Sequence, residues 1–260
     1  MRRGFTLVEL VLVLLVIALT THRAVREVSR IREAKLVAAA DRQLEDIRAA
    51  ALAFLADTGR MVMVTNGTLS ELWERPAGMP EYRVIAASAA NIAAGADHAL
   101  ADASVHVPTG WRGPYLRLPF GKSRLLDPWG NPIEILDSAG LVRVGVTNGV
   151  FASSVSHYGP RGQPDDDRTV SLLPERGGSC SLTVWASGSG VLNEVTLAWY
   201  GPASGAITGA VARVPANEQH RFDGLTPGER IVTARVGAAS PVVRLVDIRP
   251  GDNLLEVKIQ

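Results

Sequence analysis

The sequence predicts an α+β protein, in which a long N-terminal helix with a membrane-spanning first half packs on a small antiparallel sheet, and an all-β sandwich follows. Three observations support this prediction. Residues 5–19 are almost wholly apolar, and apolar residues then recur at helical spacing as far as Asp57. The 25 glycines and 15 prolines favour many turns. After about residue 180, short segments with alternating apolar residues are typical of a sandwich.

The composition excludes several classes of protein. Across 260 residues, 27 Lys and Arg stand against 26 Asp and Glu, so the net charge is +1 and the overall balance attracts neither nucleic acid nor an anionic membrane surface. The single Cys180 excludes an intramolecular disulfide and a cysteine-based zinc site. We therefore expect a folded chain that has a hydrophobic core and no nucleic-acid partner.

The first twenty residues form a targeting or membrane segment. Residues 1–4 are basic, and the run from Phe5 to Leu19 is apolar except for Thr6 and Glu9. A secretory signal peptide has a similar start, but no small-x-small cleavage site follows this run. A plain anchor has no use for the carboxylate of Glu9, because an ionised group inside a membrane costs roughly 2.5–3.5 kcal/mol and is normally paired.

One continuous helix is expected over residues 5–57, with its transmembrane part at 5–21. Glycine readily adopts the left-handed conformation that closes a helix, so Thr58-Gly59 should end it. The apolar first half would lie in a membrane, and the amphipathic second half would pack on a globular head. The charged residues between 26 and 48 are interpreted as a solvated face.

The head is predicted over residues 58–175. Thr68 and Glu71 have the spacing of a capping box, which predicts a short helix over 68–75. The Ala-rich segment 82–110 is expected to form a helix and a loop.

The tract D-P-W-G-N-P, residues 127–132, specifies a tight turn, which makes Asp127 and Trp129 scaffold residues. Strands of a small antiparallel sheet are expected at 133–136, 141–146 and 149–157.

The composition changes at residues 174–179, which resemble a linker, so a domain boundary is expected near 176 and the sandwich over 176–260. Trp185, Trp199 and Tyr200 are interpreted as core residues, although a carbohydrate or protein contact also suits them. Seven strands are predicted in this part: 181–186, 194–200, 207–214, 219–222, 230–236, 242–248 and 253–259.

No enzyme motif is present in the sequence. The nucleophile elbow G-x-S-x-G, the zinc motif H-E-x-x-H, the P-loop and G-x-G-x-x-G are all missing. The five histidines lack metal-ligand spacing: His22, His98, His106, His157 and His220. An anchored hydrolase is the main rival hypothesis, and we expect the chain not to be an enzyme.

The segment R-R-G-F-T-L-V-E-L, residues 2–10, resembles the class III signal of type IV prepilins and of type II secretion pseudopilins. The resemblance implies cleavage between Gly4 and Phe5 by prepilin peptidase, which also methylates the new N-terminus, and so makes residues 1–4 a leader. It further implies that Glu9 neutralises the N-terminal amine of a neighbouring subunit, since a buried charge needs an opposite charge. The alternative is that Glu9 only reaches the membrane interface.

Three further tracts are similar to major pseudopilins: residues 68–81, W-R-G-P-Y-L at 111–116, and L-D-P-W-G-N-P at 126–132. The segment F-D-G-L-T-P-G-E-R-I-V-T-A, residues 222–234, resembles transthyretin-like or carboxypeptidase-regulatory-like modules. Such modules bind or space other parts and rarely catalyse.

The major-pseudopilin resemblance also implies a calcium loop at residues 156–170. Its candidate ligands are a backbone carbonyl near Tyr158 and the carboxylates of Asp165, Asp166 and Asp167, which suit a hard cation. Arg161 stands where the family usually has an aspartate. In the alternative, Arg161 or Arg168 pairs with these aspartates and closes the loop without metal. Apart from possible calcium, no cofactor is expected.

The function implied by the resemblance is that of a structural subunit of a type II secretion pseudopilus. Its partners would be copies of itself and other pseudopilins in a helical filament, prepilin peptidase, the inner-membrane platform of the secretion machine, and inner-membrane lipid before assembly. The head would lie in the periplasm. The alternative is a minor pilin or an adhesive tip subunit of a type IV pilus, with the sandwich as its binding module.

Overall fold

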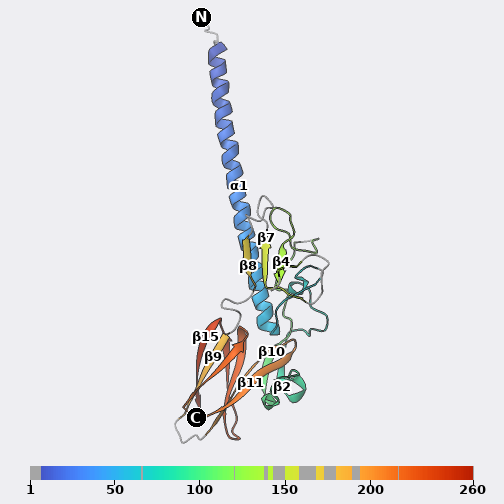
Figure 1. The fold of residues 1–260 in the computed structure, drawn as a ribbon, viewed down its shortest axis with the longest axis vertical. Helices are drawn as coiled ribbons and strands as arrows, with labels where there is room; N and C mark the ends of the chain where they lie inside the picture. Colours follow the sequence, from blue (N-terminus) through green and yellow to red (C-terminus); the bar gives the residue numbers. More distant parts are fainter. Residues whose placement is uncertain are drawn as a thin grey trace.

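A long helix, α1 (Leu7–Thr58), extends from the N-terminal end of the molecule and ends between a head and a sandwich (Figure 1). The computed structural model describes the chain in the following segments: 7–65, 67–119, 121–137, 140–142, 150–157, 168–172, 180–188, 194–215 and 217–259. The fold is thus α+β, with one long helix followed by antiparallel sheets.

The second half of α1 is buried because its apolar residues recur every three or four positions. Leu44, Ile47, Ala51 and Phe54 are almost fully inaccessible and form one core with the head. The helix ends as the sequence predicts. Gly59 has φ +73°, and its N–H donates to the Leu55 carbonyl at 2.8 Å.

The head contains a four-stranded antiparallel sheet in the order β5-β4-β7-β8 and a short pair, β1 with β6. Strands β7 and β8 lie along α1. The bounds of the head strands are β1 (Met63–Val64), β4 (Glu134–Asp137), β5 (Gly140–Val142), β6 (Val150–Phe151), β7 (Ser154–His157) and β8 (Arg168–Ser171).

The predicted capping box is wrong. A single 3-10 turn, η1 (Ser70–Leu72), replaces the helix over 68–75, and its N-cap makes no side-chain hydrogen bond. The Thr68 hydroxyl donates to the Thr65 carbonyl instead. Glu71 is buried, and its carboxylate accepts two hydrogen bonds from the Arg60 guanidinium, at 2.7 and 2.8 Å. A charge-assisted bidentate pair of this kind is stronger than a neutral cap.

The D-P-W-G-N-P turn forms as predicted. The buried carboxylate of Asp127 accepts from the backbone N–H groups of Trp129 at 3.0 Å and Asn131 at 2.7 Å. Gly130 has φ +94°, which a residue with a Cβ rarely adopts. Asp127 therefore holds the turn together before β4.

The segment 82–110 is a β-hairpin and not the expected helix and loop. Strands β2 (Arg83–Ala87) and β3 (Asp102–Thr109) pair antiparallel. Two 3-10 turns, η2 (Ala89–Asn91) and η3 (His98–Leu100), lie between them. The alanine content suggested a helix, but the period-two alternation of Val105 and Val107, which are both buried, decides the structure.

The C-terminal part is a sandwich, and all seven predicted strands are confirmed. One sheet has the order β11-β10-β13-β14 and the other β12-β9-β15, in which β9 and β15 run parallel. The bounds are β9 (Cys180–Gly188), β10 (Val195–Ala203), β11 (Ala206–Val214), β12 (Gln219–Leu225), β13 (Gly228–Val236), β14 (Val242–Ile248) and β15 (Gly251–Ile259). The predicted boundary near 176 lies outside the described residues.

Both faces of β10 are buried. Val195 and Leu197 face the core between the two sheets. Ala198 and Tyr200 face the other way and form a separate apolar core with the inserted hairpin. Tyr200 is thus a core residue, as predicted, and the residues packed on it come from the β2–β3 hairpin.

We expect Leu100→Ala to lower the free energy of unfolding by about 2–5 kcal/mol. Leu100 is fully buried between the hairpin and the sandwich, so the substitution removes apolar contacts and leaves a cavity. The measurement is urea unfolding of the full chain in mild detergent. Val84→Ala, on the exposed side of the same hairpin, should change stability by less than about 0.5 kcal/mol. Equal stability of the two variants would contradict the packing of the insertion.

Candidate functional site

The first half of α1 is free of contact with the rest of the described chain up to about residue 35. Its large apolar side chains between Leu7 and Leu19 are 48–79% exposed. Cover by the head begins at Leu36. Such a continuous exposed apolar surface is rare on a soluble monomer and marks a surface that packs against something else.

Two hydroxyl groups along this half are satisfied within the helix. Thr20 donates to the carbonyls of Val16 and Ile17 at 2.9 and 3.0 Å, and Ser29 donates to Val25 at 2.9 Å. Their polar groups therefore need no water. No helix in the described part of the chain is both long enough and apolar enough to cross a membrane.

Of the predicted processing and assembly residues, only Glu9 falls within a described element. Gly4 and Phe5 lie outside the described residues. Glu9 is in the first turn of α1, but its side chain lies outside the described part of the structure.

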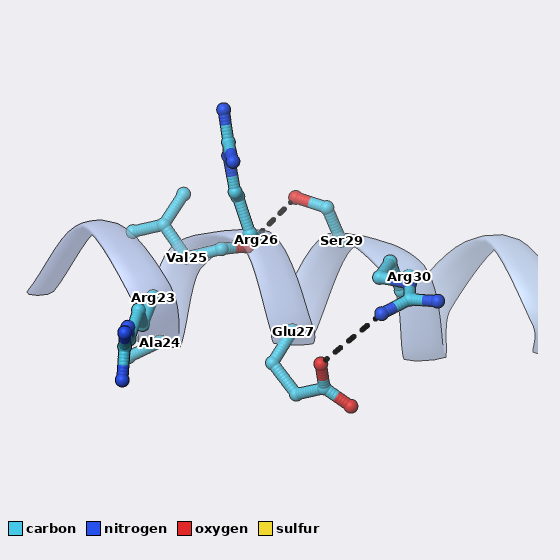
Figure 2. Close-up of a pocket in the computed structure, with 7 residues that line it drawn as sticks. All are labelled: Arg23, Ala24, Val25, Arg26, Glu27, Ser29 and Arg30. Atoms are coloured by element: carbon cyan, nitrogen blue, oxygen red, sulfur yellow. Dashed lines mark hydrogen bonds and ion pairs between the residues drawn. The ribbon is translucent and has the colours of Figure 1, made fainter. Parts of the chain in front are cut away.

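A basic segment follows the apolar half. Residues 22–35 contain five cations and two carboxylates, a local net charge of +3, and all of them are exposed. Arg23, Arg26 and Arg30 line a shallow groove with Glu27 (Figure 2). The Arg30–Glu27 pair is 3.9 Å apart and exposed, so it contributes little.

The other end of α1 is held by the sandwich. A Cβ at Gly59 would collide with the carbonyl of Pro202, and a Cβ at Gly228 would collide with Ala56. Both glycines are thus required for the helix end to approach β10 and β13. The N–H of Ser204 donates to the Thr58 carbonyl at 2.7 Å, which satisfies one of the free carbonyls of the last turn.

Among the described residues, Arg230 is the largest fully buried side chain, and it lies at this junction. Its guanidinium donates to the carbonyl of Pro227 at 3.0 Å, to the Thr226 hydroxyl, and to the Ala56 carbonyl of α1 at 3.4 Å. Burial lowers the pKa of Arg230 to about 10, so it is still charged at neutral pH. A cation beside the last carbonyls of a helix is favoured by the helix dipole.

A cavity of about 370 Å³ lies beside this junction, between α1, the segment after β3, and the β13–β14 sheet. On its wall the Asp57 carboxylate accepts from the Tyr115 hydroxyl at 3.1 Å and lies 3.7 Å from the Arg112 guanidinium. Tyr82, Glu229 and Asp247 also contribute polar groups to the lining.

The polar groups of this cavity connect the end of α1 to the segment after β3. Burial raises the pKa of the Asp57 carboxyl, although Arg112 and Tyr115 oppose the shift. Burial also raises the pKa of the Tyr115 phenol, which therefore stays protonated and donates to Asp57. Because Tyr115 remains a donor, the pair fixes the chain after β3 to the end of α1.

The candidate calcium loop joins two neighbouring strands. Tyr158, Arg161, Asp165, Asp166 and Asp167 lie outside the described residues, between β7 and β8. His157 and Arg168 pair in the ladder, so the two ends of the loop are adjacent.

One arginine of the metal-free alternative also contacts α1. One guanidinium nitrogen of Arg168 donates to both carboxylate oxygens of Asp41, at 2.7 and 2.8 Å. Within the described residues, no three His, Cys, Asp or Glu side chains are grouped closely enough to hold a metal ion. The oxygen-rich loop composition still suits a hard cation.

Sequence reasoning missed two buried charges. Arg230 has the same parity as Val232, Ala234 and Val236, so the alternation that predicted β13 also places Arg230 on its inward face. No sequence pattern indicated that Glu71 would be buried, because only the folded structure brings its partner Arg60 next to it.

Comparison with protein-family models and with curated proteins finds no match for this chain. The interpretation of its function therefore depends on the N-terminal motif and on the geometry described above.

Asp57→Asn should make the chain less sensitive to pH. In the wild type the folded-state pKa of Asp57 is raised, so its stabilising contribution is present below the unfolded pKa near 3.8 and is lost as pH rises through the folded value. The stability of the wild type relative to Asp57→Asn should fall across that window. Denaturant unfolding as a function of pH measures this difference. The exposed Asp46→Asn on the same helix is the control, and an equal pH dependence in both variants would refute the assignment.

Proposed function

We propose that the chain is a structural subunit of a type II secretion pseudopilus, which assembles from the inner membrane after prepilin peptidase cleavage and N-methylation and helps to drive the export of folded proteins. The observation that carries this proposal is the free apolar half of α1, which projects away from the head (Figure 1). A filament built from helices needs such a surface on every subunit. The R-R-G-F-T-L-V-E-L motif supports the same proposal.

Assembly in this proposal replaces lipid with neighbouring helices. A large aliphatic side chain that moves from water to a fully buried position contributes roughly 1.5–3 kcal/mol. Helices that move from lipid into a filament do not gain this energy, and their association is stabilised mainly by van der Waals packing. Glu9 then supplies selectivity, since its buried charge is tolerated only when a cation meets it. The amine of Phe5 in the adjacent subunit is that cation, and the pair sets the stagger of the helices.

The remainder of the chain acts as a rigid body on this helix. The junction formed by Arg230, Asp57 and Tyr115 ties the end of α1 to the sandwich and to the chain after β3. A push along the helix axis is thus transmitted directly to the sandwich. The subunit has a mechanical function and no catalytic one.

A tip or minor subunit of a type IV pilus is the second candidate, and the position of the sandwich favours it. The sandwich lies beyond the end of α1, at the end of the molecule opposite the N-terminus (Figure 1). A subunit that leaves the membrane head first would carry the sandwich on the side of the growing tip. Trp185 is 37% exposed on the outer face of β9, where a bound ligand would contact it.

Glu9→Ala should abolish incorporation into filaments while processing continues, because the amine of the neighbouring subunit loses its counter-charge but the cleavage site is intact. Intact-mass measurement should find a chain that begins at methylated Phe5, and filament isolation should find the variant almost entirely in the membrane fraction. Glu27→Ala removes an exposed carboxylate from the same helix and should assemble normally. Normal assembly of Glu9→Ala would argue against both filament hypotheses.

Calcium should raise the melting temperature of a soluble fragment that begins at Ser29. At a hundred times the dissociation constant, binding adds about 2.7 kcal/mol to the native state. The gain should disappear with chelator and in the variant with Asp166→Ala and Asp167→Ala. If the fragment melts at the same temperature with metal and with chelator, the loop closes by ion pairing and the minor-subunit hypothesis gains weight.

A further inference from the structure

The basic segment of α1 begins directly after its apolar half. Arg23 follows Leu19 by four residues, about 6 Å along the helix axis. If the apolar half lies in a membrane before assembly, Arg23 and the turns after it lie at the level of the lipid headgroups. The inference below therefore rests on the proposed function.

Three arginines of this segment share one face. Arg23, Arg26 and Arg30 are spaced by three and four residues, which places neighbouring side chains on adjacent turns of the same face. The close-up shows their side chains spreading from this side of the helix (Figure 2). Like charges at these spacings disfavour an isolated helix. Glu27 offsets them only through one long, exposed contact.

The direction of the side chains favours a contact on the apolar side. In an α-helix every Cα–Cβ bond tilts toward the N-terminus, so each of these side chains begins in the direction of the apolar half. Long arginine side chains beside a membrane extend their charged ends to the interface in the same way. The opposite face carries the exposed aliphatic residues Val25, Val28 and Ile31. Arg32 and Lys35 lie on that opposite side, two and five residues beyond Arg30, so the three arginines form the part of the basic segment nearest the apolar half.

We propose that Arg23, Arg26 and Arg30 form a binding surface for the phosphate groups of anionic phospholipids on the head side of the membrane. The planar guanidinium fork matches phosphate oxygens, and three forks on adjacent turns can engage neighbouring headgroups. The near-neutral balance of the whole chain conceals this local charge. The site holds the unassembled subunit at a defined depth and favours regions of the membrane that are rich in anionic lipid.

The test is a competition between two kinds of vesicle. The full chain in mild detergent is mixed with vesicles of phosphatidylcholine and with vesicles of equal parts phosphatidylcholine and phosphatidylglycerol. The detergent is then removed, and the protein in each population is measured after flotation. Each arginine near an anionic surface favours binding by about fivefold, so removing three should reduce the preference for anionic vesicles on the order of a hundredfold.

The variant with Arg23→Gln, Arg26→Gln and Arg30→Gln should lose this preference and still enter both kinds of vesicle. A matched variant removes three exposed arginines from the head, with Arg83→Gln, Arg117→Gln and Arg124→Gln, and should keep it. Raising the salt concentration should weaken the preference of the wild type.

Two results would overturn the inference in different ways. Equal entry of the wild type into both vesicles, or an unchanged preference in the first variant, would remove the lipid site and leave the proposed function intact. Failure of the wild type to enter either kind of vesicle would remove the membrane stage of the proposed function and the lipid site with it.

Discussion

The end of α1 is the constraint on which the rest of the structure depends. The last carbonyls of a helix have no partners within the helix, and burying them without donors is costly. Here the sandwich supplies the donors, through the Arg230 guanidinium at Ala56 and the Ser204 N–H at Thr58. The sandwich therefore takes part in how the helix ends, because its groups satisfy carbonyls of the last turn.

The inserted hairpin is a second consequence of the same arrangement. Because α1 and the head occupy only one end of the β10–β13 sheet, the remaining outer surface needs its own cover. Leu100, Val105 and Val107 provide it, packing on Ala198 and Tyr200. The hairpin, which none of the recognised sequence motifs covers, thus connects the two halves of the chain. Asp102 of the hairpin adds an ion pair with Arg235 of β13.

The sequence predicted the elements whose signals are local and left out those that depend on distant partners. The end of α1 at Gly59 and the seven sandwich strands follow from one glycine and from alternation. The capping box failed because Glu71 is paired by Arg60, and the helix expected within 82–110 failed because Val105 and Val107 alternate into the core that the hairpin shares with the sandwich. In the candidate site, Glu9 is identified by the motif, whereas the cluster at Asp57 required three elements to meet.

The parallel pairing of β9 with β15 has a consequence for how the sandwich bears load. The register runs from Cys180 opposite Gly251 to Gly188 opposite Ile259, so the chain enters the sandwich at one end of this ladder and leaves it at the other. Tension between the helix and the C-terminus would pull these two strands past each other, and the inter-strand hydrogen bonds would resist together rather than break one after another. The terminal strands are thus arranged in shear, the geometry that suits a domain under tension.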